Sequence, residues 1–223
     1  MDFTTIAIAI LICLLIYLIW KYATTSSTNI VTLQTAKTVA AFPSSQLPKS
    51  ANSNLAFSSW IYINQWRPTD LKPILVSKNK TLSLNMNSTT NDLIVKVKEN
   101  KSGNVFKTIT VNNIPIQTWV NIIVSINQRT VDVYINGKLV KTAIMNSTFS
   151  GLSNTDTINV GGPKSFDGYI SQVEYFPVPV GPQQAWDIYS AGYGVSPTSS
   201  LFNKYQIKFS FIKDNQEVST VNI

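Results

Sequence analysis

The side chains that enzymes use for acid–base and nucleophilic chemistry are sparse in this sequence. Its three glutamates, Glu99, Glu174 and Glu217, lie far apart, and none has another carboxylate two residues away. Retaining glycoside hydrolysis needs two carboxyls about 5 Å apart, which alternate residues of one strand would supply. The absence of histidine removes Ser-His-Asp and Cys-His nucleophiles and the commonest metal ligand. The sequence therefore predicts no catalytic residue and a protein that is not an enzyme.

The eight aspartates are dispersed, without the closely spaced run that a calcium site favours. Asp156 and Asp167 flank one predicted strand and could meet at one rim of the domain. Alternatively, Asp167 caps the turn before Gly168, which is the reading that we favour. We expect no metal site and no cofactor.

One loop combines residue types that recognise ligands. In Trp66-Arg67-Pro68-Thr69-Asp70 an aromatic ring stands next to one of only two arginines, a pair that can stack on a sugar or anchor a protein partner. Alternatively, Trp66 closes the end of the hydrophobic core. Tyr193, in AGYGVSP, is a similar candidate. We therefore predict Trp66, Arg67, Asp70 and Tyr193 as contacts for a protein partner or a glycan.

The charge pattern argues against nucleic-acid binding. The net charge is +7, but sixteen of the eighteen basic residues are scattered lysines, without an arginine cluster or a basic run that contains aromatic residues. The only cysteine, Cys13, lies in an apolar run, so no disulfide forms within the domain. A domain without disulfides fits the cytosolic side of a membrane.

The N-terminal segment from Phe3 to Trp20 contains eighteen residues without a charge. As a helix it would be about 27 Å long, close to the apolar thickness of a bilayer. A cleaved signal peptide is the alternative, but Asp2 precedes the run and no small-x-small cleavage site follows it. We predict a transmembrane anchor over residues 1–22 that contacts the lipid bilayer, with anchor residues Ile6, Ile10, Leu14, Tyr17, Trp20 and Lys21.

The orientation of the anchor follows from the flanking charges. Lys21 and Lys37 come after the apolar run and Asp2 comes before it, so the positive-inside bias places the following domain on the cytoplasmic side. The sequence thus predicts a single-pass membrane protein.

The rest of the chain divides by composition. Residues 23–53 are rich in Ser and Thr with two prolines, which predicts a linker of roughly 30 Å, with a possible edge strand at 29–33. Residues 54–194 show the short β-branched and aromatic runs of a sandwich. Residues 195–223 form a tail whose strand, Tyr205–Ile212, packs on the sandwich or on a neighbouring subunit.

Within residues 54–194 the strongest local signal is VDVYINGKLVK, because Asn136-Gly137 suits a type I′ hairpin turn. The one predicted helix, Pro182–Ala191, begins with proline and stops before Gly192. These patterns predict an all-β, two-sheet antiparallel sandwich preceded by one N-terminal transmembrane helix. The other predicted strands are Ala56–Ile63, Ile74–Ser77, Thr81–Asn85, Leu93–Lys98, Val105–Val111, Trp119–Ile126, Val131–Ile135, Lys138–Ala143, Thr157–Val160 and Gly168–Phe176.

Three sequence strings carry a resemblance to a known family. PIQTWVNIIVSINQRTVDVYINGKLVKT resembles the central hairpin of the concanavalin-A-like, laminin-G-like superfamily, FSSWIYI resembles its early buried strand, and INVGGP with FDGYISQVEYFPVPVGPQQAWDIYSAG resembles its closing segment. The resemblance spans about Leu55 to Gly192 and implies a jelly-roll fold. Because this fold hosts lectins, hydrolases, adhesion modules and structural domains, it does not by itself imply an activity.

Two functions are compatible with these features. The first is a structural tether that holds a protein assembly to a membrane. Anchored proteins with one such domain resemble those of large icosahedral DNA viruses, which implies a minor capsid or membrane component of a virion, with capsid proteins as partners. The alternative is a cell-surface, lectin-like module that binds glycans. The two differ in the side of the membrane on which the domain stands.

Overall fold

The computed structural model describes residues 11–15, 17, 27–50, 54–194, 208–213 and 216–222, the last two ranges by their backbone alone. Among these residues, no helix is both long enough and apolar enough to span a membrane. Residues 11–15 and 17 are helical, and the predicted anchor residues Leu14 and Tyr17 are exposed. Ile6, Ile10, Trp20 and Lys21 lie outside the described residues, so the anchor remains a prediction.

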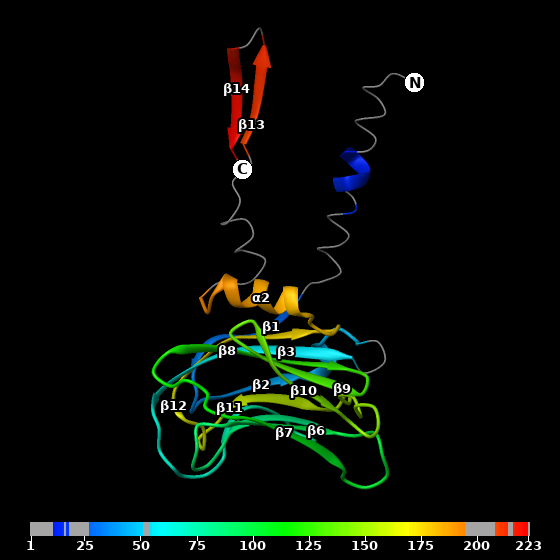
Figure 1. Cartoon of the computed structure of the whole chain (residues 1–223), viewed down its shortest axis with the longest axis vertical. Helices are drawn as coiled ribbons and strands as arrows, with labels where there is room; N and C mark the ends of the chain where they lie inside the picture. The colour runs from blue at the N-terminus through cyan, green and yellow to red at the C-terminus, as the bar shows by residue number, and fades with distance from the viewer. Residues whose placement is uncertain are drawn as a thin grey trace.

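Two antiparallel six-stranded sheets face each other in the domain (Figure 1). We call them sheet A and sheet B, and their arrangement confirms the predicted all-β sandwich. Sheet A has the order β1-β12-β3-β8-β9-β10, with bounds Thr28–Thr35, Asp167–Phe176, Leu55–Gln65, Trp119–Asn127, Thr130–Ile135 and Lys138–Ile144. Sheet B has the order β2-β11-β4-β5-β6-β7, with bounds Val39–Pro43, Thr157–Gly161, Lys72–Ser77, Leu82–Met86, Leu93–Lys98 and Phe106–Val111.

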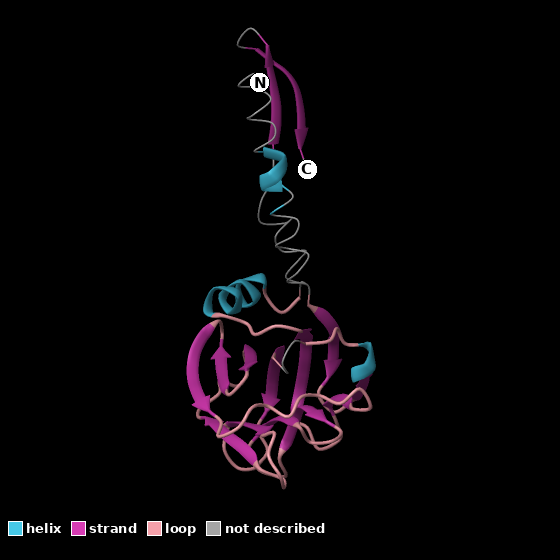
Figure 2. Ribbon diagram, turned by 90° about the vertical axis from the view of Figure 1, so that its right-hand side faces the viewer, coloured by secondary structure: helices cyan, strands magenta, loops and turns pink. Residues whose placement is uncertain are grey.

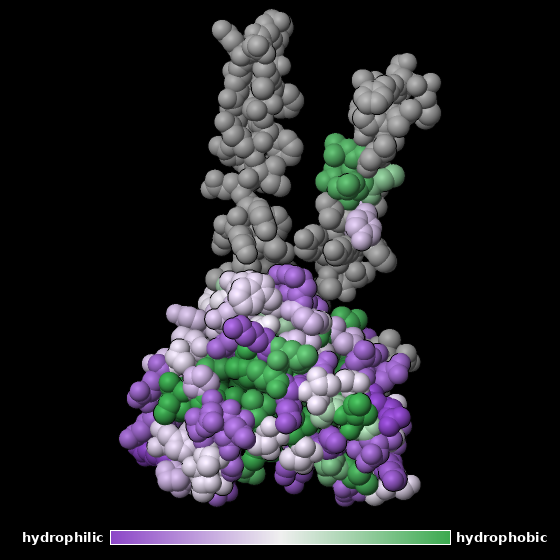
Figure 3. All heavy atoms as spheres, in the orientation of Figure 1, coloured by the Kyte–Doolittle hydropathy of each residue, from purple (hydrophilic) through white to green (hydrophobic). Residues whose placement is uncertain are grey.

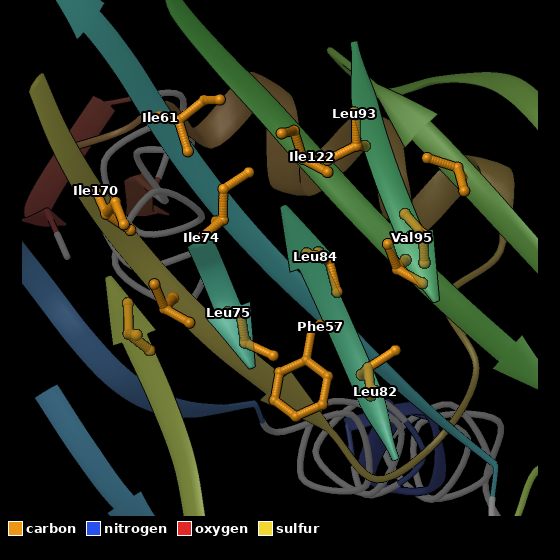
Figure 4. Close-up of a cluster of buried hydrophobic side chains, with 14 of the residues drawn as sticks. Phe57, Ile61, Ile74, Leu75, Leu82, Leu84, Leu93, Val95, Ile122 and Ile170 are labelled. Carbon is orange, nitrogen blue, oxygen red and sulfur yellow. The ribbon is translucent and has the colours of Figure 1, made fainter. Parts of the chain in front are cut away.

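The core fills the space between the sheets with branched aliphatic side chains around Phe57, which is fully buried (Figure 4). Alternate residues of a strand point to opposite faces of its sheet. In β8 the inward set is therefore Val120, Ile122, Val124 and Ile126, all of which are fully buried, as the alternation in the sequence predicts.

Helix α2, Pro182–Ala191, covers part of the outer face of sheet A (Figure 2). Its buried residues Ala185 and Ile188 pack with Ile123 and Tyr134 in a second, smaller apolar cluster. The helix starts with proline and ends at Gly192, whose φ of 87° suits glycine. This second layer explains why β8 is buried on both faces over most of its length.

The structure differs from the predicted linker over much of residues 28–50, although β1 lies where the sequence offered a possible edge strand at 29–33. Strand β1 pairs with β12 and strand β2 pairs with β11, so both belong to the sandwich. Both strands lie at a sheet edge and contribute few buried side chains, since only Val31 of β1 is buried. An edge strand can therefore have the polar, hydroxyl-rich composition of a linker. The segment between the apolar run and β1 therefore comprises only residues 21–27, which is much shorter than the predicted linker.

The C-terminal segment contains a strand where one was predicted. Strand β13, Lys208–Lys213, overlaps the predicted Tyr205–Ile212, and it pairs with β14, Gln216–Asn222, in a separate two-stranded sheet. Strand β14 was not predicted, because its residues lack an apolar run.

Candidate functional site

A cleft of about 270 Å³ opens at one rim of the sandwich, between three loops. The loops join β3 to β4, β11 to β12, and β1 to β2, so residues far apart in the sequence meet there. Four basic side chains and two carboxylates line the cleft: Lys37, Arg67, Lys72 and Lys164 with Asp70 and Asp167. A recess of about 310 Å³ beside residues 44–50 has one charged lining residue, Lys49, so the rim cleft has the larger number of charged side chains.

Lys72 organises the rim from inside. Its side chain is buried, and its Nζ donates to the carbonyl oxygens of Asp70 at 3.1 Å, Ser88 at 3.0 Å and Asn87 at 3.3 Å. Burial lowers the pKa of this ammonium, an effect that the nearby Asp70 carboxylate partly offsets. The ammonium thus ties the loop before β4 to the loop after β5.

Trp66 lies against the core rather than in the lining of the cleft. Its Nε1 donates to the carbonyl oxygen of Thr89 at 3.2 Å, and Lys72 Nζ lies 4.5 Å from the ring centroid. This placement matches the alternative in which Trp66 closes the end of the core. Its ring is already occupied by protein contacts.

Arg67 and Asp70, in contrast, are both exposed and line the cleft. Asp70 forms an ion pair of 3.2 Å with Lys164, and the guanidinium of Arg67 donates to the side-chain oxygen of Gln65. Such exposed contacts contribute little to stability, so they leave both side chains open to exchange partners. The structure therefore brings two of the four predicted contact residues together.

Asp156 and Asp167 do not meet. Asp156 is buried before β11, where its carboxylate accepts from the backbone N–H groups of Asn79 and Thr157. Asp167 lies beyond the other end of β11, in the rim cleft. Within the described part of the chain, no three Cys, Asp or Glu side chains come together in a way that could hold a metal ion. The prediction that the protein is not an enzyme stays a prediction.

Tyr193, the fourth predicted contact, belongs to a different surface. It stacks on Trp119 with ring centroids 4.5 Å apart, and it contacts Trp60 edge-on at 6.0 Å. The register of sheet A aligns Tyr169, Tyr62 and Trp119 on three adjacent strands. We call this outer surface the aromatic face; it comprises Trp60, Tyr62, Trp119, Tyr169, Trp186, Tyr189 and Tyr193.

The aromatic face was not predictable as a unit from the sequence, because its members come from four separate segments. Two local signals of a shared surface are present: the alternation of Trp60 and Tyr62 on β3, and the three-residue spacing of Trp186 and Tyr189 on α2. The contact of Tyr62 with Trp119 follows from the pairing of β3 with β8. The contacts of Trp60 with Tyr189 and Tyr193 follow from the course of the chain through and after α2.

A buried acid lies on the same side of sheet A. Glu174 is 1% exposed, pairs in register with Ser58, and its Oε1 has no hydrogen-bond partner among the described residues. Burial raises the pKa of this carboxyl to about 7, although a hydrogen bond with Ser27 acts in the opposite direction. Ser58 in turn accepts from Asn121 Nδ2 at 3.1 Å.

The two facing antiparallel sheets define the class of jelly-roll sandwiches. The family model described as the concanavalin A-like lectin/glucanases superfamily matches residues 34–185. The chain belongs to this superfamily, as the resemblance of its three strings implied. No curated protein matches the chain in sequence.

Solved structures with a similar fold include the binding domains of botulinum neurotoxins. The serotype D receptor-binding domain has a TM-score of 0.57 at 14% identity, covering 74% of this chain and 47% of that one. The neurotoxin DC binding domain, solved in complex with rat synaptotagmin II, has a TM-score of 0.54 at 17% identity, covering 75% and 46%. This chain spans less than half of their length, and the likeness at such identities shows the fold alone.

Replacing Lys72 with methionine should lower the free energy of unfolding by about 2 kcal/mol, because three carbonyl oxygens lose a charged donor in a buried place. Urea unfolding of the full chain in a mild detergent measures the change. Lys78→Met is the matched control, since Lys78 is exposed. If the two variants unfold at the same urea concentration, Lys72 does not hold the rim together.

Proposed function

We propose that this protein is a non-enzymatic binding module that residues 3–20 anchor in a membrane, and that its rim cleft contacts a protein partner. The observation that supports the binding site is the presence of two exposed side chains of opposite charge, Arg67 and Asp70, on one loop that the buried Lys72 holds in place. A rigid loop with exposed charges loses little conformational entropy when it binds.

The cleft suits a polar and partly acidic partner. Its four basic side chains outnumber its two carboxylates, and Lys164 can exchange its exposed pair with Asp70 for a carboxylate of a partner. Together with the anchor, such a site would tether a protein assembly to a membrane. By the resemblance to anchored proteins of large icosahedral DNA viruses, we propose the membrane of a virion as the setting and capsid proteins as the partners.

Photo-crosslinking tests this function. A photoreactive amino acid at position 67 of the full chain, in the membrane-containing particles of its source, should give one cross-linked protein of defined mass. The same amino acid at Lys107, on the edge strand β7 and away from the cleft, is the control. Equal cross-linking from both positions, or none from position 67, would contradict the proposal.

Glycan binding is the second candidate, because the same cleft contains hydrogen-bonding side chains of Gln65, Arg67 and Asp167 in a space that a sugar ring can enter. A glycan array separates the two candidates. Specific binding that Asp167→Ala abolishes would favour the lectin-like function, and protease protection of the domain in sealed cells would favour the cytoplasmic tether.

A further inference from the structure

The aromatic face has few charges, and three of its aromatic side chains are exposed to solvent. Leu33, next to it on β1, is 61% exposed, and Trp186, Tyr193 and Tyr169 are 47%, 46% and 41% exposed. Helix α2 has a single charged residue, Asp187. The residues of β3 and β8 that face outward beneath this surface also carry no charge. Tyr62 and Trp119 are half-buried, and the others are buried: Ala56, Ser58, Trp60, Asn121, Ile123 and Ser125. Tryptophan and tyrosine on an uncharged surface are typical of the boundary between lipid and water.

Both ends of the sandwich domain leave from this side of sheet A. At the N-terminal end, Ser27 forms its hydrogen bond with Glu174, whose neighbours Ser58 and Asn121 point outward. At the C-terminal end, Ser171 Oγ donates to the carbonyl oxygens of Tyr193 and Thr32, at 2.7 Å and 2.6 Å. Residues 11–15 lie beyond α2, on the same side (Figure 1), and Figure 3 shows them as an apolar group.

The link between the apolar run and this face is short. Seven residues, 21–27, join Trp20 to the first residue of β1. Fully extended, they span at most about 25 Å. A compact domain of 100 residues has a radius of gyration of about 13 Å, so its diameter exceeds this reach. A folded partner therefore does not fit between the bilayer and the aromatic face.

We propose that the aromatic face lies against the lipid headgroups of the bilayer that residues 3–20 span. The inference rests on the anchor in the proposed function and adds to it an orientation: sheet A faces the lipid and sheet B faces away. Trp186 on α2, with Tyr193, Tyr169 and Leu33, then provides the contacts with lipid. The rim cleft, which lies at one end of the sheets, stays open to a partner beside the membrane.

Site-specific labelling tests this orientation, because Cys13 is the only cysteine and Cys13→Ser leaves the full chain free of thiols. In this background, Leu33→Cys and Gln183→Cys place a bimane label on the side of the aromatic face. Lys96→Cys and Thr108→Cys, both exposed and paired in register on sheet B, are the matched controls. The chains are reconstituted in phosphatidylcholine vesicles that contain a lipid with a nitroxide on its headgroup.

We expect several-fold stronger quenching at positions 33 and 183 than at positions 96 and 108. Equal quenching at all four positions would overturn the proposal. So would a label at position 33 with blue-shifted but unquenched fluorescence, because the C-terminal segment or a protein would then cover the face. Near-ultraviolet circular dichroism of each labelled chain checks that the sandwich is folded.

Extraction of the same vesicles with alkaline carbonate tests the membrane anchor separately from the orientation of the aromatic face. A chain that stays in the lipid pellet but shows equal quenching keeps its anchor and lacks the proposed orientation. A chain released into the supernatant contradicts the anchor itself.

Discussion

Replacing Glu174 with glutamine should raise the free energy of unfolding by about 3 kcal/mol near pH 8 and leave it almost unchanged below about pH 4.5. Glu174 is buried on the outer side of sheet A, and its Oε1 lacks a donor among the described residues. Burial raises the pKa of its carboxyl from the ordinary value of 4.5 to about 7. The ionised form is therefore costly in the folded protein at neutral pH.

The direction of the pH dependence follows from this difference. Since the pKa is higher in the folded than in the unfolded chain, the native state binds the proton more tightly. The contribution of Glu174 to the free energy of unfolding should be highest below about pH 4.5, fall as the pH rises to about 7, and change little above it. Glutamine stays neutral over this range and removes the slope. Urea unfolding of the full chain in a neutral detergent, at a series of pH values, measures both curves.

Glu99 provides a matched control, because it is also buried but its carboxylate has donors. Its two oxygens accept from the backbone N–H groups of Asn146 and Ser147, at 3.3 Å and 3.1 Å. Glu99→Gln should therefore lower the free energy of unfolding by about 1 kcal/mol near pH 8. A difference in the free energy of unfolding between Glu174→Gln and wild type that stays the same between about pH 4.5 and 8 would contradict the role of Glu174.

The strands that were predictable from the sequence are those in the middle of the sheets. Such strands bury one face or both, so their branched residues either alternate with polar ones or form a continuous apolar run, and both patterns are visible in the sequence. The hairpin turn at Asn136-Gly137 was predictable for a local reason, since both residues have the positive φ that a type I′ turn requires, 51° and 73°. The start and end of α2 followed from Pro182 and Gly192 in the same way.

The edges and the site depend on register, which the sequence does not display. Strands β1 and β2 each pair with one neighbour and expose much of their surface, so their composition resembles that of a linker. In the sequence Lys72 does not differ from the lysines of the surface. Only the pairing of β4 with β5 brings its ammonium to three carbonyl groups. The loop at Arg67 and Asp70 was predictable because both residues stand in one short segment. The aromatic face was not, because it forms only when β3, β8, β12 and α2 come together.

Gly168→Ala should lower the free energy of unfolding by about 3 kcal/mol or more. Gly168 lies near the start of β12, next to a register shift in the pairing of β12 with β3, and its φ is 154°. A Cβ atom there would lie 1.9 Å from the carbonyl oxygen of Tyr62 and 2.9 Å from its carbon. Both are backbone atoms, so no side chain can turn away to make room.

The substitution must therefore separate β12 from β3 in the middle of sheet A. The carbonyl oxygen of Gly168 also accepts from the N–H of Ala36 at 2.9 Å, so the turn between β1 and β2 should loosen with it. The measurement is the fraction of full chain that is folded by near-ultraviolet circular dichroism, together with its urea midpoint. Gly194→Ala is the control, because a Cβ there meets no atom within 4 Å, and its effect should stay below about 0.5 kcal/mol.

Tyr62 and Tyr169 are cross-strand partners, and Tyr169 directly follows Gly168. Gly168→Ala should therefore also disturb the aromatic face before it disturbs sheet B. In a partly folded population, hydrogen exchange should accelerate first at Tyr62 and Tyr169, and later at the β5–β6 pair. Uniform acceleration across both sheets would instead mean that the sandwich unfolds as one unit, with no separate opening of sheet A. A variant as stable as Gly194→Ala would contradict the close approach of β12 to β3 itself.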